Sequence, residues 1–271
     1  TPDQEPVLGW RPALEQKVPG TPWTLEEKLG EGGFGEVWLG RHETFNRKRV
    51  FKFCFRADRV RSLKREVTLF KLLHERVGEH PNIVTVHDVF FDEPPYYITM
   101  DFVEGRDLVT WAREQGGVEK LPLETRLGIV AQIADALQAA HDAGVIHRDV
   151  KPSNILVEAG QASRRSGAEG RTLLVESPVQ SANQTGSVAW SGGTPDLLCV
   201  KLTDFGIGQV VSEEILAGHT RAGFTQTMLG STSSSHSGTQ MYMAPELLAG
   251  KPATTRSDIY SLGVVLYQLL V

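Results

Sequence analysis

Two short stretches decide the fold of this chain: VIHRDVKPSNILV, from Val145 to Val157, and KLTDFG, from Lys201 to Gly206. The first holds an acid, a base and an amide close together, Asp149, Lys151 and Asn154, between apolar runs that are typical of strands. A carboxylate beside a reactive hydroxyl can accept its proton. Carboxylate and amide oxygens also suit Mg²⁺ when the ion is held together with substrate phosphates. The two stretches therefore indicate a site for phosphate chemistry, to which other segments must contribute.

The composition is that of an ordinary globular protein. The chain has 271 residues, of which 40% are apolar and 23% charged, enough for one large domain or two lobes. Its net charge of −5 argues against a surface built for nucleic acid or an anionic membrane. The two cysteines, Cys54 and Cys199, make no disulfide framework and favour a reducing, cytoplasmic location. The longest apolar run, Tyr260–Val271, is too short to cross a bilayer, so we expect no membrane contact from this segment.

The hydrophobic pattern divides the chain into a β-rich part and a helical part. Residues 1–22 are spaced with prolines and are expected to form an extended lead-in. Residues 23–103 read mainly as strands and residues 104–271 mainly as helices. Residues 158–195 are rich in Gly, Ser, Ala and Gln, and we expect a disordered insertion there. The expected strands are Trp23–Leu29, Glu36–Arg41, Arg49–Phe55, Ile83–Phe91, Tyr96–Phe102, Ile155–Val157 and Leu198–Leu202, and the expected helices are Val60–Arg76, Leu123–Ala143 and one from about Ser257.

A glycine-rich stretch, GEGGFGEV from Gly30 to Val37, contains the pattern G-x-G-x-x-G. In dinucleotide-binding folds this pattern leads into a helix. Here a strand is expected on both sides, so the stretch predicts a hairpin. Glycines would let backbone N–H groups approach a phosphate, because no Cβ obstructs them. A plain glycine turn is the alternative interpretation.

One lysine stands in the middle of an apolar strand. Lys52 lies in VFKFCF, and a buried ammonium group needs a partner. Glu66 lies beside Val67 on the apolar stripe of the nearby expected helix, so the two charges would be compatible as a pair. The alternative is that both side chains reach solvent, as most lysines and glutamates do.

In their order along the chain, these motifs resemble those of the eukaryotic-like serine/threonine protein kinases, and DFVEGRDL after Met100 resembles bacterial members. The resemblance implies an α+β, bilobal fold. Residues 23–103 would form a small N-lobe, an antiparallel β-sheet with one helix, and residues 104–271 an α-rich C-lobe. The matching segments are GEGGFGEV, Val50-Phe51-Lys52 with Glu66, His147-Arg148-Asp149 followed by Lys151 and Asn154, Asp204-Phe205-Gly206, Ala244-Pro245-Glu246, and Ser257 to Gly263.

The resemblance also implies catalytic roles for single residues. Asp149 would orient and deprotonate the acceptor hydroxyl, and Lys151 can neutralise charge on the transferring phosphoryl group. Lys52 would hold the α- and β-phosphates of ATP, steadied by Glu66. His147 is interpreted as a core histidine. It would stack with Phe70 and Phe205 rather than take part in catalysis.

The implied cofactors are ATP and Mg²⁺, with Mn²⁺ as an alternative ion. Asn154 and Asp204 would hold the metal, and Met100 would lie at the back of the adenine pocket. The backbone of Asp101 and Val103 would bond adenine. The residues expected around the nucleotide are Gly30, Glu31, Gly32, Gly33, Phe34, Gly35, Val37, Val50, Lys52, Met100, Asp101, Val103, Asn154, Leu156 and Asp204.

Regulation by autophosphorylation is a further hypothesis. Arg148 precedes Asp149, and in kinases of this type such an arginine can pair with a phosphate on the segment that follows Asp204. The alternative is that this Ser- and Thr-rich tract is merely flexible. The candidate acceptors are Thr220, Thr225, Thr227, Ser231, Thr232, Ser233, Ser234, Ser235 and Ser237.

The last residues suggest an incomplete C-lobe. The sequence stops at Val271, whereas the resemblance implies several later helices and, within them, an arginine partner for Glu246. We therefore expect a piece of a longer protein, unstable or inactive when expressed alone.

The predicted function is Mg²⁺-dependent transfer of phosphate from ATP to Ser or Thr hydroxyls of protein substrates, with the chain itself as one substrate. One alternative is a pseudokinase that binds nucleotide without turnover, and intact Lys52, Asp149, Asn154 and Asp204 argue against it. Another is a kinase for small molecules, which seldom carries both the full HRDVKPSN run and the Ala244-Pro245-Glu246 segment. No nucleic-acid partner is expected.

Overall fold

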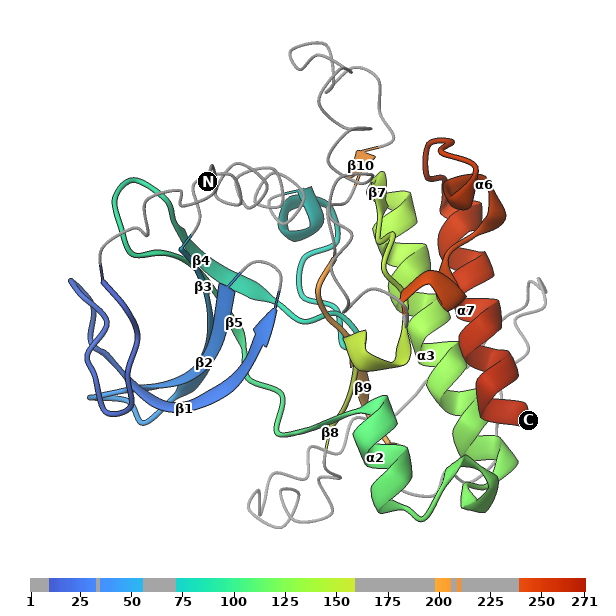
Figure 1. The fold of residues 1–271 in the computed structure, drawn as a ribbon, viewed down its shortest axis with the longest axis horizontal. Coiled ribbons are helices and arrows are strands. Elements are labelled where there is room, and N and C mark those ends of the chain that lie inside the picture. Colours follow the sequence, from blue (N-terminus) through green and yellow to red (C-terminus); the bar gives the residue numbers. More distant parts are fainter. Residues whose placement is uncertain (1–9, 33–34, 56–71, 159–197, 206–208, 211–238) are drawn as a thin grey trace, which may run out of the picture.

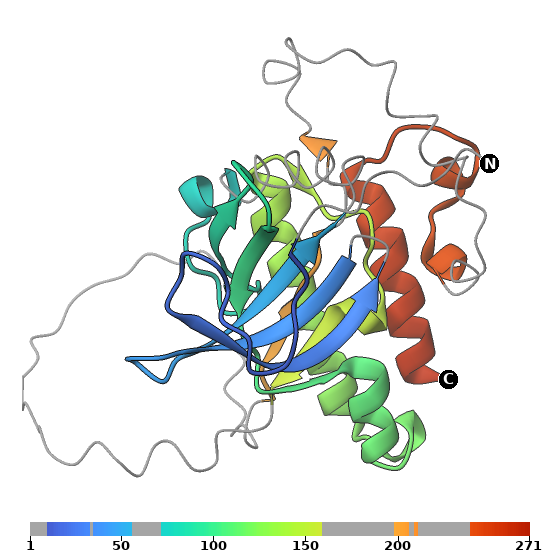
Figure 2. The same ribbon diagram turned by 60° about the vertical axis from the view of Figure 1, so that its left-hand side comes forward.

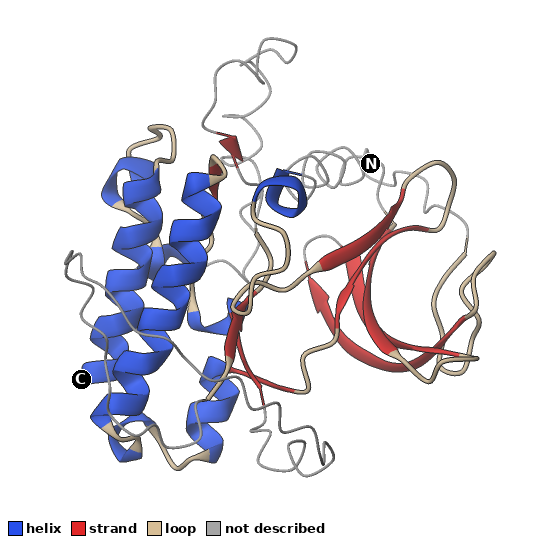
Figure 3. Cartoon of the chain, turned by 180° about the vertical axis from the view of Figure 1, so that it is seen from behind, coloured by secondary structure: helices blue, strands red, loops and turns tan. Residues whose placement is uncertain are grey.

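The structure is a computed structural model that describes residues 10–32, 35–55, 72–158, 198–205, 209–210 and 239–271. These residues form two lobes, a β-sheet lobe and a helical lobe, joined by the segment that follows β5 (Figure 1). Seen from behind, the helices gather on one side and the large sheet on the other (Figure 3). The α+β, two-lobed arrangement expected from the sequence is confirmed.

The N-lobe sheet contains all five strands that the sequence predicts for this lobe. Its order is β1-β2-β3-β5-β4 and every neighbouring pair is antiparallel. Turns and tight connections suffice to join most antiparallel neighbours, so the chain passes through this sheet almost in sequence order. The strands are β1 (Trp23–Gly32), β2 (Gly35–His42), β3 (Lys48–Cys54), β4 (Val86–Phe90) and β5 (Tyr96–Asp101).

The two faces of this sheet differ in character because side chains alternate along a strand. On β3, Phe51 and Phe53 are fully buried in a cluster that is rich in aromatic rings. Val50 and Cys54, on the opposite face, join a second cluster with Ile98. We call the first face the outer face and the second the inner face. Lys52 shares the inner face with Val50.

The lead-in is only partly an extended segment. From residue 10 onward it packs on the outer face, where Val18 is fully buried and the Trp10 ring contacts the Phe53 ring. In Figure 2 this dark-blue segment runs across the strands of the N-lobe. The sequence pattern did not show this packing.

The C-lobe consists of helices and two small sheets. One sheet has the order β6-β8-β9, and the other pairs β7 with β10. Within the described ranges, no helix is both long and apolar enough to cross a membrane. The strands are β6 (Gly105–Asp107), β7 (Val145–Ile146), β8 (Ile155–Glu158), β9 (Val200–Leu202) and β10 (Gln209–Val210), and the α-helices are α2 (Leu108–Glu114), α3 (Leu123–Asp142), α6 (Pro245–Leu248) and α7 (Thr255–Leu270).

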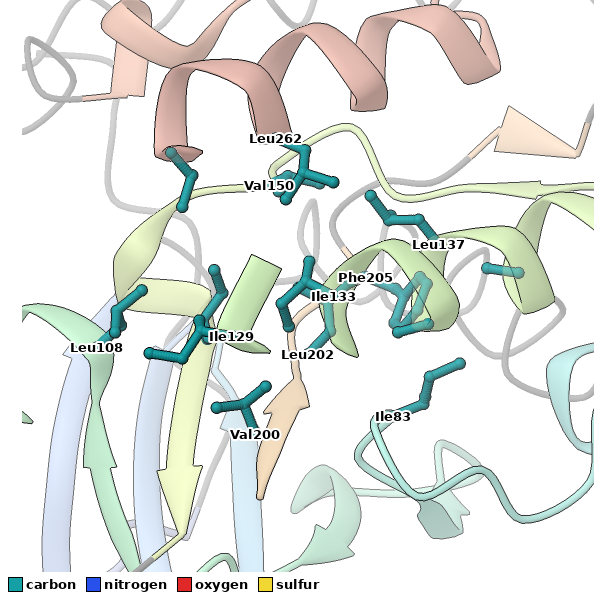
Figure 4. Packing of buried hydrophobic residues seen from close by; sticks show 14 of the residues in the cluster. Ile83, Leu108, Ile129, Ile133, Leu137, Val150, Val200, Leu202, Phe205 and Leu262 are labelled. Carbon is teal, nitrogen blue, oxygen red and sulfur yellow. The ribbon is translucent and has the colours of Figure 1, made fainter. Parts of the chain in front are cut away.

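The C-lobe core lies between α3, α7 and the β8-β9 pair. Apolar side chains of α3 such as Ile133 and Leu137 are fully buried, and Leu202 of β9 and Leu262 of α7 belong to the same cluster (Figure 4). The expected helix Leu123–Ala143 is confirmed to within one residue. Gly144 follows it with φ +80°, a conformation that favours glycine and ends the helix.

Two side-chain amides, Asn82 and Gln132, hold the start of β9, the strand that follows residues 159–197; those residues lie outside the described part of the chain. The Asn82 side chain donates to Gln132 Oε1 at 2.9 Å and to the Val200 carbonyl at 2.8 Å. Val200 N donates in turn to Gln132 Oε1 at 3.1 Å. β9 therefore returns to pair with β8, whose last residue is Glu158, one residue inside the insertion that the sequence predicts.

Candidate active site

The loop between β7 and β8 brings Asp149, Lys151 and Asn154 together, as the sequence predicts. Asn154 Nδ2 donates to the Asp149 carboxylate at 3.0 Å and to the Asp149 carbonyl at 2.8 Å. Lys151 Nζ lies 2.7 Å from the same carboxylate. Two donors thus fix the Asp149 carboxylate in one orientation, and charge-assisted contacts of this kind are the stronger ones.

The loop that holds Asp149 is anchored by Asp258 of α7. The carboxylate of Asp258 is fully buried and accepts three hydrogen bonds. The backbone N–H groups of His147 and Arg148 donate at 2.8 and 2.7 Å, and His141 Nε2 of α3 donates at 2.7 Å. Arg148 has φ +70°, a strained conformation for a residue with a side chain. Asp258 therefore compensates for local strain next to Asp149.

His147 is a core residue, as the sequence interpretation predicts. Its ring is fully buried and lies 4.5 Å from the Phe205 ring, centroid to centroid. Nε2 donates to the Thr203 carbonyl at 3.0 Å, and Nδ1 accepts from Asp149 N at 3.2 Å. One ring nitrogen donates while the other accepts, which describes a neutral imidazole. Burial lowers the pKa of His147, in agreement with a neutral ring. Phe70, the third expected member of the stack, lies outside the described residues.

The strand lysine of the N-lobe reaches the C-lobe. Lys52 Nζ lies 3.2 Å from Asp204 Oδ1, and the Lys52 side chain is 12% exposed. The nearby ammonium charge lowers the pKa of Asp204, whose side chain is 44% exposed. Glu66, the partner that the sequence predicts for Lys52, lies outside the described residues, so that pairing stays a prediction.

The glycine-rich hairpin contacts the backbone of β3 at Gly35. Gly35 has φ +145°, and a Cβ built there would lie 2.1 Å from the Phe53 carbonyl oxygen, so only glycine fits. Gly30 and Gly32 belong to β1, where they pair with Val37 and Gly35 of β2. The hairpin predicted from the sequence is therefore confirmed, and Gly33 and Phe34 at its tip lie outside the described residues.

Glu31 and Val37 differ in what they offer a nucleotide. The Glu31 side chain is paired with Lys28 at 2.9 Å, on an exposed surface. Only its backbone is then available for a phosphate. Val37 is the register partner of Lys52 and therefore shares the inner face with it.

An apolar cluster lies at the junction of the lobes, where adenine is expected. Met100 and Val103 are buried in it, with Val50 of β3 and Leu156 of β8 packed against them. Strands from both lobes therefore contribute to one apolar surface. Mostly apolar walls with a few polar groups are typical of small-molecule sites.

Asp101 is the last residue of β5 and directly follows Met100 of this cluster. Its backbone N–H donates to the Thr85 carbonyl at 2.9 Å. His87 Nε2 donates to the Asp101 carboxylate at 2.6 Å, and this hydrogen bond lowers the pKa of Asp101. The segment that would contact adenine is thus tied to β4 and to Thr85, which directly precedes it.

The oxygen ligands needed for a divalent ion are present. Thr203 N donates to the Asn154 carbonyl at 2.9 Å, so Asn154 and Asp204 lie on adjoining segments. The Asn154 amide nitrogen points to Asp149, which leaves its side-chain oxygen for other partners. In the part of the chain that the structure describes, no three His, Cys, Asp or Glu residues form a metal cluster. One amide and one carboxylate oxygen still fit Mg²⁺, which usually takes its other ligands from phosphate and water.

Glu246 has a partner in Ser257, in place of the arginine that the resemblance implies in later helices. Ser257 Oγ donates to its carboxylate at 2.6 Å, and this hydrogen bond lowers the pKa of Glu246. Glu246 is also only partly buried, beside a cavity of about 520 Å³ between α6 and the start of α7. The Glu246 carboxylate is therefore neither fully buried nor unpaired in the structure.

Of the two partners in the autophosphorylation hypothesis, the structure describes Arg148 but not the Ser- and Thr-rich tract. Burial lowers the pKa of Arg148 to about 10, so the side chain remains a cation at neutral pH. The candidate phosphorylation sites from Thr220 to Ser237 lie outside the described residues.

Comparison with known proteins agrees with this geometry. Residues 23–271 match the protein kinase domain family. This chain belongs to the protein kinase family. The kinase domain is 31% identical to the serine/threonine-protein kinases PkaA and PkaB of Streptomyces coelicolor, over 93% of the chain in both cases. It is 30% identical to the serine/threonine-protein kinase PrkC of Bacillus subtilis over 89% of the chain. These relatives are bacterial, as the resemblance suggests, and the chain covers 39%, 49% and 29% of their respective lengths.

Two residues that hold the loop around Asp149 were not singled out from the sequence. Asp258 lies within the matching segment Ser257 to Gly263, and His141 lies within the expected helix Leu123–Ala143. A carboxylate on an apolar helix and a histidine on an apolar stripe were the available signals. Neither pattern says which residue the other one meets, because α3 and α7 are far apart in the chain.

Proposed function

We propose that this kinase domain transfers the γ-phosphoryl group of ATP to serine or threonine hydroxyls of protein substrates. The observation that carries the proposal is the gathering of Lys52, Asp149, Asn154 and Asp204, from both lobes, around the junction of β3, β8 and β9. The family and the bacterial serine/threonine kinases among its relatives support the same reaction.

Asp149 is assigned to the acceptor hydroxyl. Its carboxylate is held by Asn154 and Lys151 and is 28% exposed, so one edge remains open to a substrate. A carboxylate in this position can orient the hydroxyl and take its proton as the oxygen attacks phosphorus. Lys151 stands beside it and supplies positive charge where the transferred group accumulates negative charge.

Lys52, Asn154 and Asp204 are assigned to the nucleotide. The Lys52 ammonium would bind the α- and β-phosphates of ATP, while the apolar surface around Met100, Val103 and Leu156 would receive adenine. Asn154 and Asp204 would hold Mg²⁺, or Mn²⁺ in its place, and the bound ion would neutralise phosphate charge. Glu66 would steady Lys52. Backbone N–H groups of the hairpin between Gly30 and Gly35 would cover the phosphates.

The setting of the reaction is also part of the proposal. A cytoplasmic location is supported by the low cysteine content, two residues that are not joined in a disulfide, and by access to ATP. Autophosphorylation within residues 220–237 would place a phosphate where the Arg148 guanidinium can bind it. Mass spectrometry after incubation with Mg-ATP tests this part, and an unmodified tract in an active enzyme would contradict it.

The experiment for the main proposal is phosphate transfer from radiolabelled ATP to a generic basic protein. Transfer is expected from the wild-type protein that contains this kinase domain, and Lys52→Met and Asp204→Ala in that protein are expected to abolish it. Lys28→Met is a matched control, because Lys28 is a β1 lysine paired on the surface with Glu31. Equal transfer by the Lys52→Met and Lys28→Met variants would overturn the assignment.

A further inference from the structure

A segment before the family match lies against the sheet that carries Lys52. Residues 10–18, which we call the strap, pair with the edge of β1. Leu25 N donates to the Gln16 carbonyl at 2.9 Å, and the Leu25 carbonyl accepts from Glu15 N at 2.8 Å. Val18, at the end of the strap, is fully buried in the aromatic cluster of the outer face. The strap is therefore an integral part of the lobe.

The other end of the strap contacts the last residues of β3 and the residue after it. The Trp10 ring lies 5.3 Å from the Phe53 ring, centroid to centroid. The guanidinium of Arg11 lies over the Phe55 ring, 4.1 Å from its centroid. Aromatic pairs and cation–π contacts are attractive beyond the apolar area that they bury. Trp10 and Arg11 therefore contact Phe53 and Phe55, two aromatic residues on the outer face at the end of β3.

The residue that Trp10 contacts is connected to the nucleotide site through its backbone. Phe53 is fully buried and follows Lys52 directly. Its carbonyl oxygen is the atom that Gly35 approaches so closely that no Cβ fits. A shift of β3 at Phe53 would therefore move both the ammonium that reaches Asp204 and the seat of the glycine-rich hairpin.

We propose that Trp10 and Arg11 are positioning residues for ATP binding. Their packing on the outer face fixes the position of β3, and so fixes the positions of the Lys52 ammonium and of Gly35 on the inner face. The proposal rests on the role assigned to Lys52 above. Side chains in a packed interior transmit displacement because there is little free volume to absorb it. Misplacement of a binding group by about 1 Å can cost a large factor in rate or affinity.

A purely structural strap would behave differently from a positioning strap. Loss of stability alone lowers the melting temperature but leaves the affinity of the folded molecules for ATP unchanged. Loss of position changes ATP affinity even when all molecules are folded. ATP affinity, measured well below the melting temperature of each variant, therefore separates the two roles.

The experiment compares Mg-ATP affinity by calorimetry in the protein that contains this kinase domain and in its variants. Trp10→Ala is expected to weaken binding roughly threefold to tenfold, with Trp10→Phe restoring most of the loss because a ring remains against Phe53. Arg11→Ala is expected to weaken binding about twofold. Leu14→Ala is the matched control, since Leu14 lies in the same strap and is 65% exposed, and it should bind as the wild type does.

Trp10→Ala and Arg11→Ala variants that bind ATP as tightly as Leu14→Ala would overturn the proposal. If Trp10→Ala does not fold, the exposed Arg11 decides by the same criterion. Lys52→Met separates this inference from the proposed function. Equal binding by wild type and Lys52→Met would refute the role of Lys52, whereas a loss with Lys52→Met alone would refute only the strap.

Discussion

The loop around Asp149 and strand β3, which carries Lys52, are held in place by different kinds of contact. The loop around Asp149 is fixed by hydrogen bonds to one buried carboxylate, Asp258. β3 is fixed by aromatic packing on its outer face, where Phe51 and Phe53 are fully buried. Hydrogen-bond networks fail abruptly when a buried partner is lost, whereas apolar packing weakens in proportion to the volume removed. Asp149, the proposed general base, is thus held by a hydrogen-bond network, whereas Lys52, the proposed phosphate ligand, is held by apolar contacts that a substitution can weaken by degrees.

The largest effect is expected from Asp258→Ala. This change leaves two backbone N–H groups and His141 without their buried acceptor, which should cost about 3–5 kcal/mol of unfolding free energy. Phosphate transfer should fall by more than about a hundredfold, because Arg148 can leave its strained conformation and displace Asp149. Urea unfolding and the radiolabel assay measure the two effects.

Asp142→Ala is the control for Asp258→Ala, since Asp142 is an exposed acid next to His141 in sequence. It should change both quantities little. An Asp258→Ala variant as stable as this control would break the contrast between the two regions.

A smaller, graded effect is expected from Phe53→Leu on the other side of the comparison. The apolar side chain is shortened but not removed, so the loss of unfolding free energy should be about 1–2 kcal/mol. Phe45→Leu, at a site that is 68% exposed, should stay within about 0.5 kcal/mol of the wild type. Thermal and urea unfolding measure both. An all-or-none loss of folding with Phe53→Leu would show that the strand is held as rigidly as the loop.

The smallest effect concerns pH and sharpens the picture of the loop. Burial lowers the pKa of His147 in the folded protein, so below its ordinary pKa of about 6.5 the unfolded chain binds a proton that the folded chain does not. Stability from this group is therefore complete above about pH 6.5 and decreases as the pH falls toward the lowered pKa, by less than about 1.4 kcal/mol per pH unit.

His147→Gln removes the titration while keeping one donor and one acceptor. Urea unfolding at pH 7.5 and at pH 5.5 should show a steeper loss on acidification for the wild type than for the variant. Equal losses would mean that His147 titrates alike in the folded and unfolded chain, contrary to its neutral, buried geometry.

Local patterns predicted the strands of the N-lobe, β8, β9, α3 and α7, whereas shorter elements such as α2, β6 and β7 were not predicted. The strands of the N-lobe follow from apolar runs between glycines and charged turns, and α3 follows from its helical stripe and Gly144.

The mid-strand position of Lys52 predicted an acidic partner, without showing that Asp204 lies near it. Within the described residues that partner is Asp204 of the other lobe, and the predicted partner Glu66 lies outside them. The packing of Trp10 on Phe53 could not be foreseen, because proline-spaced sequence carries no period that assigns a face.

The most direct test of the central claim, a single Mg-ATP site shared by the two lobes, is calorimetry of Mg-ATP with Asp204→Ala and Asp149→Asn. Asp204→Ala should weaken binding by more than about tenfold and make it insensitive to Mg²⁺. Asp149→Asn should keep its affinity within about threefold of the wild type while transferring no phosphate, because the proposed role of Asp149 is toward the acceptor hydroxyl and not the nucleotide. Undiminished, Mg²⁺-dependent binding by Asp204→Ala, or full transfer by Asp149→Asn, would contradict the account.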